Sequence, residues 1–207
     1  MAKMKLFYSP ASPYVRKVMV LAHEAGLEKK IETVAVMVTP VKANPDVAKR
    51  NPLMKIPALI DGDTTVYDSP VVCEYLDSKH RGKKLFPAKG KARWTALRQQ
   101  ALADGLLDAA LLVRYEVTLR PENLRNAEWH AGQMGKIGAA IDQMEKEAGS
   151  LKGAPTIGQI TFGCALGYLD FRFADYDWRK SHKKLATWFE KFSKRPSMKA
   201  TVPAMPV

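Results

Sequence analysis

Cysteine and histidine are both scarce in this chain. Only two cysteines, Cys73 and Cys164, occur among 207 residues, and a chain of this length can bury a core without disulfide staples. The sequence therefore excludes a secreted, disulfide-built scaffold and favours a reducing compartment such as the cytosol. Both cysteines fall in apolar helical stretches, where a free thiol acts as a small core hydrophobe. The four histidines have no metal-ligand spacing, so we expect no metal site.

A long hydrophobic run is also missing. The first ten residues contain no apolar stretch of the length, about 7–15 residues, that marks a signal peptide. The most apolar later stretch, residues 101–113, is interrupted by Asp104 and Asp108, unlike a membrane span. We therefore expect no signal peptide, no membrane-spanning segment and a cytoplasmic protein.

Acidic residues are too few to balance the basic ones. The chain has 33 Lys and Arg against 21 Asp and Glu, a formal net charge of +12, of which residues 1–80 contribute +2 and residues 81–207 contribute +10. No zinc-finger spacing, helix-turn-helix signature or aromatic-interleaved basic motif accompanies this charge. Solvated surface charge therefore explains it better than specific nucleic-acid binding.

The first residues alternate between strand and helix signals. Residues 4–8 are apolar enough for a strand, which a turn rich in serine and proline ends. Ser12 as N-cap and Pro13 as first helical residue then open a helix whose apolar side chains recur at three- and four-residue steps up to Gly26. Period-two alternation in residues 34–38 predicts a second strand.

Turn and helix signals continue this pattern. A short helix is expected at residues 45–50, and residues 57–67 predict a β-hairpin around the turn 61–63. Ser69 as N-cap and Pro70 then open another helix. The resulting order β-α-β-(α)-β-β-α resembles the thioredoxin-like fold.

The rest of the chain looks helical. Residues 81–90 hold glycine, proline and basic residues with little apolar content, which predicts a linker between a domain of residues 1–80 and one of residues 91–207. Four helices are expected after it, and the third opens with the spacing of a capping box at Thr156 and Gln159. Their ranges are about 94–119, 123–148, 156–174 and 182–194. The predicted fold is an α/β thioredoxin-like N-terminal domain plus an all-α helical-bundle C-terminal domain.

This plan resembles that of the cytosolic glutathione transferases, and local motifs match the family in the same order. Residues 51–59 are similar to the family's Asn-Pro-x-x-x-x-Pro-x-Leu segment, whose second proline is cis, and Tyr67-Asp68-Ser69 is similar to its acidic-Ser motif. Residues 155–160 resemble its capping box, with Gln159 where the family usually has Asp, and residues 195–203 resemble a common bacterial ending. The resemblance covers nearly the whole chain.

The resemblance implies that glutathione is a co-substrate and that no other cofactor is needed. The residues it implies for glutathione binding are Ser12, Lys55, Ile56, Pro57, Asp68 and Ser69. Two helix N-termini in one small domain favour the negative charges of glutathione. The Ser69 N–H and hydroxyl would hold the γ-glutamyl carboxylate, and Asp68 would pair with the ammonium group. Ile56, just before the implied cis-Pro57, would bind the cysteinyl backbone as a strand does.

The chemistry needs a group that stabilises the glutathione thiolate. A free thiol with a pKa near 8.5 is only about 3% ionised at pH 7. A charge-assisted hydrogen bond and a helix N-terminus together lower such a pKa by about 1.3–3 units, so one hydroxyl donor there suffices. The resemblance places the catalytic hydroxyl at Ser12, where related transferases carry Cys-Pro-x-x. Ser9 and Tyr8 are the competing donors, and a bare N-cap is the alternative role of Ser12.

The same resemblance extends to the electrophile and to partners. The first long helix after the linker lines the cleft in transferases, which makes Asp104, Leu107, Leu111 and Tyr115 candidates for the pocket of a small hydrophobic electrophile. A homodimer is implied as well. The alternative is a non-catalytic binding module of the stringent-starvation-protein or translation-factor type, with the basic helical half as its contact surface. A glutaredoxin-type reductase is disfavoured, because position 12 has no thiol for a mixed disulfide.

Overall fold

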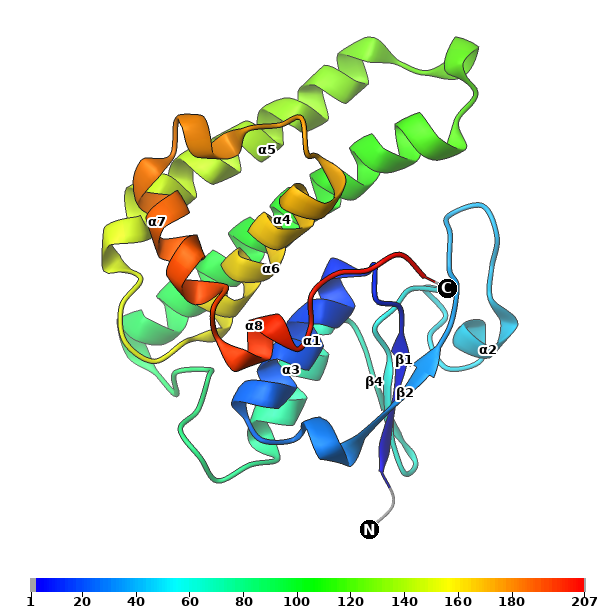
Figure 1. Ribbon diagram of the computed structural model, residues 1–207. Helices are drawn as coiled ribbons and strands as arrows, with labels where there is room; N and C mark the ends of the chain where they lie inside the picture. Colours follow the sequence, from blue (N-terminus) through cyan, green and yellow to red (C-terminus); the bar gives the residue numbers. More distant parts are fainter. Residues whose placement is uncertain (1–2, 207) are drawn as a thin grey trace. The chain divides into compact units, whose positions relative to one another are not determined.

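The computed structural model describes residues 3–206, which divide into two units (Figure 1). The thioredoxin-like unit holds residues 3–93 together with 195–206, and the helical unit holds Trp94–Lys194. The sequence-based division ended the first domain at residue 80 and assigned residues 91–207 to the second. The structure instead groups the C-terminal residues with the first unit.

The thioredoxin-like unit is built on a four-stranded sheet of order β2-β1-β3-β4. Its strands are β1 (Met4–Tyr8), β2 (Ile31–Ala35), β3 (Leu59–Asp61) and β4 (Thr64–Val66). β1 runs parallel to β2 and antiparallel to β3, and β3 and β4 form the predicted hairpin, with Gly62 at φ 60° in its turn. The prediction of residues 34–38 for the second strand was wrong by three residues. Parallel pairing with Met4–Tyr8 selects Ile31–Ala35, and Val36 and Val38 pack into an apolar cluster beyond the strand.

Helices cover both faces of this sheet. They are α1 (Pro13–Glu24), α2 (Pro45–Ala48) and α3 (Ser69–Ser78), while the short helix α8 (Pro196–Lys199) packs on α1. Phe7, Val47 of α2 and Ala58 form a buried cluster on one face. Alternation along β1 turns Leu6 to the opposite face, where α1 and α3 lie side by side (Figure 1). Leu6 has no exposed surface there.

The helical unit contains the four predicted helices: α4 (Gly90–Leu119), α5 (Ala127–Glu147), α6 (Ile157–Arg172) and α7 (Lys183–Phe192). The first turn of α4 lies in the other unit. Thr156 is the N-cap of α6 as predicted, but its side chain makes no cap hydrogen bond. The Gln159 amide donates to the Lys152 carbonyl at 3.5 Å instead. The capping-box prediction was therefore right about the helix start and wrong about the hydrogen bonds.

Short 3₁₀ turns also occur between the longer helices and strands. The turns are η1 (Glu28–Lys30), η2 (Glu122–Leu124), η3 (Ala148–Ser150) and η4 (Trp178–Lys180). No helix within residues 3–206 is long and apolar enough to cross a membrane. In the same part of the chain, no group of three His, Cys, Asp or Glu could hold a metal ion. Cys73 and Cys164 are both buried, as expected for core thiols.

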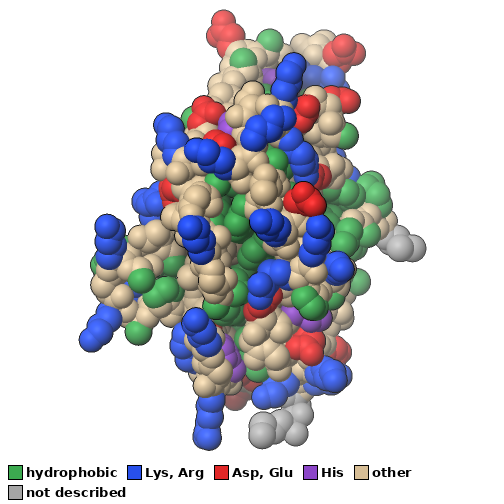
Figure 2. Space-filling view, turned by 60° about the vertical axis from the view of Figure 1, so that its left-hand side comes forward, with side chains coloured by type: hydrophobic (Ala, Val, Ile, Leu, Met, Phe, Trp, Pro, Cys, Tyr) green, Lys and Arg blue, Asp and Glu red, His purple; other side chains and the backbone are tan. Residues whose placement is uncertain are grey.

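Most of the excess positive charge lies in the thioredoxin-like unit, whereas the sequence-based division assigned it to the helical domain. The thioredoxin-like unit carries 19 of the 33 Lys and Arg but only 9 of the 21 Asp and Glu, whereas the helical unit carries 14 and 12. The excess attributed to residues 81–207 comes mostly from residues 81–93 and the C-terminal segment. On the face seen in Figure 2, Lys and Arg are spread widely, with Asp and Glu among them. With 14 basic and 12 acidic residues, the helical unit has a formal net charge of only +2.

One glycine sets how closely α6 approaches α4. A Cβ atom at Gly158 would lie 2.6 Å from Cβ and Oε1 of Gln99 and 2.9 Å from the Ala96 carbonyl oxygen. Because one of these neighbours is backbone, a side chain at this position must push the two helices apart. The helical unit therefore depends on glycine at this position.

We expect Gly158→Ala to lower the free energy of unfolding by about 1–3 kcal/mol through overpacking. Gly135→Ala, at an exposed position of α5 with no neighbour within 4 Å, should raise it by about 0.5–1 kcal/mol, because alanine favours a helix. Urea unfolding followed by circular dichroism measures both. Equal effects of the two substitutions would contradict the close packing at Gly158.

Candidate functional site

Three loops of the thioredoxin-like unit meet at one end of its sheet. β1 ends at Tyr8, and β4, which runs in the same direction as β1, ends at Val66. β3 runs the opposite way and begins just after Pro57. The Phe7 N–H donates to the Ala58 carbonyl at 3.0 Å, which places Pro57 beside the end of β1. The sheet therefore gathers the loops that contain Ser12, Ile56 and Asp68.

The turn after β1 presents Ser12 at the start of α1. The Ser12 N–H donates to the Ser9 carbonyl at 3.1 Å and closes the turn. The Ser12 Oγ accepts the Val15 N–H at 3.3 Å, and Pro13 is the first residue of the helix. Ser12 is thus the N-cap that the sequence predicted. A hydroxyl has one proton and two lone pairs, and within residues 3–206 nothing accepts the Ser12 proton. That proton is available to a ligand at the positive end of α1.

The competing donors occupy different places. Ser9 is half-buried in the turn, and its side chain makes no hydrogen bond within the described chain. Tyr8 is half-buried at the end of β1, where its carbonyl accepts the Val36 N–H at 2.9 Å. Neither stands at a helix N-terminus. Only Ser12 of the three combines a hydroxyl proton with the helix dipole.

The loop before β3 is held by Asn51. The Asn51 side chain, which is 1% exposed, donates to the Lys55 carbonyl at 2.9 Å and accepts the Leu53 N–H at 3.0 Å. The Ile56–Pro57 peptide is cis, as the resemblance implied. The backbone N–H and carbonyl of Ile56 have no partner within residues 3–206, so both can pair with an extended peptide. Sequence reasoning did not give Asn51 this role, although a polar residue before Pro52 was its signal.

The loop after β4 leads into α3. Asp68 is the N-cap and Ser69 the first helical residue, one position earlier than predicted, which is within the usual variation of helix ends. The Asp68 side chain is exposed and makes no cap hydrogen bond, while Ser69 is 3% exposed. The Tyr67–Asp68 peptide is cis. Asp68 therefore offers an open carboxylate next to the free N–H groups of a second helix start.

The four residues predicted for the electrophile all lie on α4 but differ in exposure. Asp104, Leu111 and Tyr115 are half-buried. Leu107 has no exposed surface, so its side chain supports the core and cannot touch a bound molecule. This burial argues against the direct role predicted for Leu107. The family resemblance indicates which helix lines the cleft, but it does not say which side chains of that helix are exposed.

The Tyr115 phenol has electrostatic neighbours that the sequence did not reveal. Burial raises the pKa of Tyr115, and the positive charge of Arg114 acts against this rise. Tyr168 on α6 is 3% exposed, and burial raises its pKa to about 12 although Arg114 and Arg172 oppose the change. Tyr168 and Arg172 are four residues apart and share a face of α6. The charge of Arg114 therefore acts on both phenols, and that of Arg172 acts on Tyr168.

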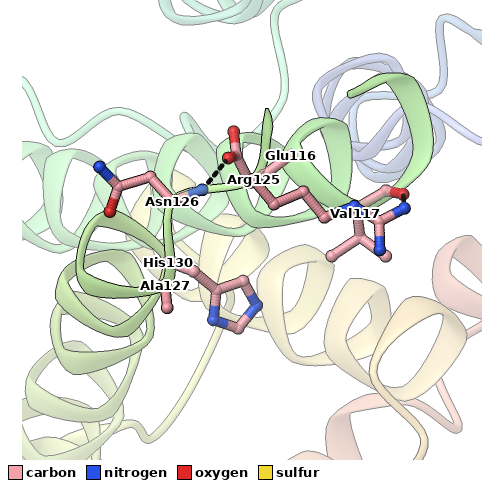
Figure 3. Close-up of a pocket in the computed structure, with 6 residues that line it drawn as sticks. All are labelled: Glu116, Val117, Arg125, Asn126, Ala127 and His130. Carbon is pink, nitrogen blue, oxygen red and sulfur yellow. Dashed lines mark hydrogen bonds between the residues drawn. The ribbon is translucent and has the colours of Figure 1, made fainter. Parts of the chain in front are cut away.

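A separate cavity of about 260 Å³ lies where α4 ends and α5 begins (Figure 3). The Glu116 carboxylate accepts the Asn126 N–H and the Arg120 Nε, both at 2.8 Å. Arg125 donates to the Val117 carbonyl at 2.7 Å. None of the residues predicted for glutathione or the electrophile lines this cavity. Its polar groups close the loop between two helices.

Comparison with known proteins agrees with this geometry. Residues 11–79 match the model of the glutathione S-transferase N-terminal domain, and residues 127–191 match that of the C-terminal domain. The GST-like protein YibF of Escherichia coli K12 is 31% identical over 204 residues, which are 97% of this chain and 98% of YibF.

Solved structures extend the comparison. A glutathione transferase family member from Pseudomonas fluorescens Pf-5, solved with bound glutathione, is 46% identical over 98% of this chain and 100% of its own, with a TM-score of 0.96. The same protein with bound S-(propanoic acid)-glutathione gives a TM-score of 0.91. With both domain models matched and near-complete coverage of these relatives, the chain belongs to the glutathione S-transferase family.

Proposed function

We propose that this protein is a glutathione transferase in which the Ser12 hydroxyl stabilises the glutathione thiolate. The observation that carries the proposal is the hydrogen bonding of that hydroxyl. Its oxygen accepts the Val15 N–H and so caps α1, while its proton remains available to donate to a ligand. The relative from Pseudomonas fluorescens, solved with glutathione, supports the choice of ligand. No further cofactor is needed for this chemistry.

The three loops offer a complementary group for each part of glutathione. Ser69 at the start of α3 suits the γ-glutamyl carboxylate, because free N–H groups and the helix dipole favour an anion there. The exposed Asp68 carboxylate suits the ammonium group beside it. The free backbone of Ile56, next to Pro57, pairs with the cysteinyl residue as a neighbouring strand would. Lys55 has an exposed side chain for the second carboxylate.

This placement directs the cysteinyl sulfur toward the start of α1. The Ser12 hydroxyl donates a hydrogen bond to the thiolate and keeps its own proton throughout. The sulfur lone pair then forms a bond to an electrophilic carbon, and either a leaving group departs with the bonding electrons or a double bond takes up a proton. With a peroxide, attack on oxygen breaks the O–O bond, and a second glutathione completes the reduction.

The positive charge of Arg114, which acts on Tyr115, favours an electrophile that has a small apolar body and a carboxylate. The Arg114 side chain makes no hydrogen bond or ion pair within residues 3–206, and its charge acts on both Tyr115 and Tyr168. Guanidinium groups bind carboxylates in preference to neutral groups. The relative solved with S-(propanoic acid)-glutathione supports a product of this kind. Thiolate addition to acrylate yields that thioether.

A homodimer in the cytoplasm remains part of the proposal, on the family resemblance. The alternative, a non-catalytic binding module, depended on a basic helical half. The helical unit carries 14 basic and 12 acidic residues, so the charge that motivated this alternative belongs to the other unit. No observation in the structure favours the module over the enzyme.

A thermal-shift titration with glutathione and with S-hexylglutathione tests the proposal. Ligands that bind only the folded state raise the melting temperature in proportion to the logarithm of their concentration. The enzyme should respond to both compounds, and S-hexylglutathione should give the larger shift through its apolar tail. No response to either compound would favour the binding module.

Ser12→Ala should raise the pKa of bound glutathione by about 1–2 units, because a charge-assisted hydrogen bond of about 1.5–3 kcal/mol is lost. Turnover at neutral pH should fall about 10- to 100-fold, while glutathione affinity changes little. The thiolate absorbance of the complex against pH measures the shift. Ser12→Thr keeps the hydroxyl and should restore most of the activity. If Ser9→Ala moves the titration and Ser12→Ala does not, the donor is Ser9.

Asp68→Asn should weaken glutathione binding by about 1.5–3 kcal/mol, because the ammonium group loses a charged partner. KM for glutathione should rise far more than kcat falls. Asp63→Asn, an exposed carboxylate in the β3–β4 turn, removes the same charge as a control and should leave KM unchanged. Steady-state kinetics at varied glutathione separates the two. Equal KM values for both variants would remove Asp68 from the site.

Arg114→Gln should lower kcat/KM for acrylate about 10-fold or more, because a guanidinium–carboxylate contact is lost. For acrylamide, a neutral compound of the same shape, kcat/KM should hardly change. The ratio of the two values, from glutathione-consumption assays, is the measurement. A wild-type protein that does not distinguish acrylate from acrylamide would refute the acidic electrophile.

A further inference from the structure

The chain returns to the thioredoxin-like unit after α7. Residues 195–206 belong to that unit, and α8 packs on α1. The segment begins near Glu24, at the C-terminal end of α1, and reaches Pro10, just before its N-terminal end. Figure 1 shows this tail passing the end of α1. It therefore runs along α1 toward the turn that contains Ser12.

The first residues of the tail, Arg195 to Ser197, are held at the C-terminal end of α1. The Glu24 carboxylate accepts the Arg195 Nε at 2.8 Å and Nη2 at 2.7 Å, and it also accepts the Ser197 hydroxyl. Burial raises the pKa of Glu24, but these hydrogen bonds and the charge of Arg195 bring it below its usual value. Ser197 and Met198 are 3% and 1% exposed. A bidentate pair of this kind fixes orientation as well as position.

Further hydrogen bonds continue this anchor. The Arg16 Nη2 donates to the Met198 carbonyl at 3.3 Å, which ties α8 to the N-terminal half of α1. The Thr201 hydroxyl donates to the Ser197 carbonyl at 2.8 Å and closes the last turn after α8. The tail therefore leaves α8 in a defined direction, toward the N-terminal end of α1.

The far end of the tail holds the turn between β1 and α1. The Ala204 N–H donates to the Pro10 carbonyl at 3.3 Å. Pro10 lies inside the turn that the Ser12 N–H closes on the Ser9 carbonyl. Proline at 203 and 206 restricts the backbone on both sides of Ala204, which reduces the entropy lost when the tail is held. One turn is thus fixed by its own hydrogen bond and by a second one from the C-terminal tail.

We propose that residues 201–206 act as a strap that positions the Ser12 hydroxyl, through the hydrogen bond from Ala204 to Pro10. The role of Ser12 in this statement rests on the proposed function. Ala204 touches no reacting atom and is therefore a positioning residue. The strap fixes the turn, the turn fixes the N-cap, and the N-cap fixes the direction in which the hydroxyl proton points. Glutathione contacts at Ile56, Asp68 and Ser69 do not depend on it.

Substitutions at Ala204 can separate the strap from a tail that only adds stability. Ala204→Pro deletes the donor N–H, whereas Ala204→Ser keeps it with a similar change in side-chain size. Loss of one hydrogen bond should raise the amide hydrogen exchange of residues 12–16, without glutathione, by about 2- to 10-fold. In the glutathione complex of Ala204→Pro, the thiol pKa should rise by about 0.3–1 unit. At a pH below that pKa, kcat should therefore fall by about 2- to 10-fold, while KM for glutathione should stay unchanged. Ala204→Ser should match the wild type in every readout.

A second variant tests the anchor in the full-length protein. Glu24→Gln removes the charge that holds Arg195, and it should increase exchange in residues 12–16 in the same direction as Ala204→Pro. Glu32→Gln, an exposed carboxylate on β2, removes the same charge and should change neither exchange nor the thiol pKa.

Three outcomes would overturn the strap. Exchange that is unchanged in Ala204→Pro shows that the tail does not hold the turn. Faster exchange with an unchanged thiol pKa shows that the turn is held without positioning Ser12. A wild-type protein that does not bind glutathione refutes the proposed function and the positioning role together, while the exchange measurement still decides whether the tail holds the turn.

Discussion

The pairing of β1 with β3 is the constraint on which the candidate site depends. The hydrogen bond from the Phe7 N–H to the Ala58 carbonyl sets the register between the two strands. That register brings Pro57 to the end of β1, and the β3–β4 hairpin then returns Asp68 to the same end of the sheet. A slip of one residue would turn Phe7 away from its cluster with Val47 and Ala58. Apolar packing under the sheet therefore keeps the polar loops together.

Local sequence signals were sufficient for most of the fold. The two Ser-Pro dipeptides predicted the starts of α1 and α3, because Pro is tolerated where a helix has no use for the N–H. Gly62 and its neighbours predicted the hairpin. The second strand was misplaced because alternation in residues 34–38 reflects packing of Val36 and Val38 beyond the strand. Hydrophobic periodicity detects buried positions, and here the partly buried positions continue to Val38, beyond the end of β2 at Ala35.

The candidate site was predictable where one residue carried its own signal. Ser12 did so as an N-cap, but the availability of its hydroxyl proton follows only from the hydrogen bonds of the folded chain. Asn51 also had a local signal, because its partners Leu53 and Lys55 lie close to it in the sequence. Arg114 beside Tyr168 and the Ala204–Pro10 bond join residues that are distant in sequence, so no local pattern could reveal them. Thr156 illustrates the reverse case. Its spacing to Gln159 is right for a capping box, yet the Gln159 amide finds the Lys152 carbonyl instead.

The two ends of the described chain lie at opposite ends of the sheet with respect to Ser12. β1 begins at Met4, far along the strand from the turn at Ser9, whereas Ala204 contacts that turn directly. An affinity tag or fluorescent protein joined after residue 206 would be attached to the segment whose Ala204 N–H bonds to Pro10, and it could disturb that hydrogen bond. The same fusion placed before Met4 would be attached at the start of β1, at the end of the strand that is remote from this turn. Work with this protein in vitro is therefore better served by N-terminal fusions.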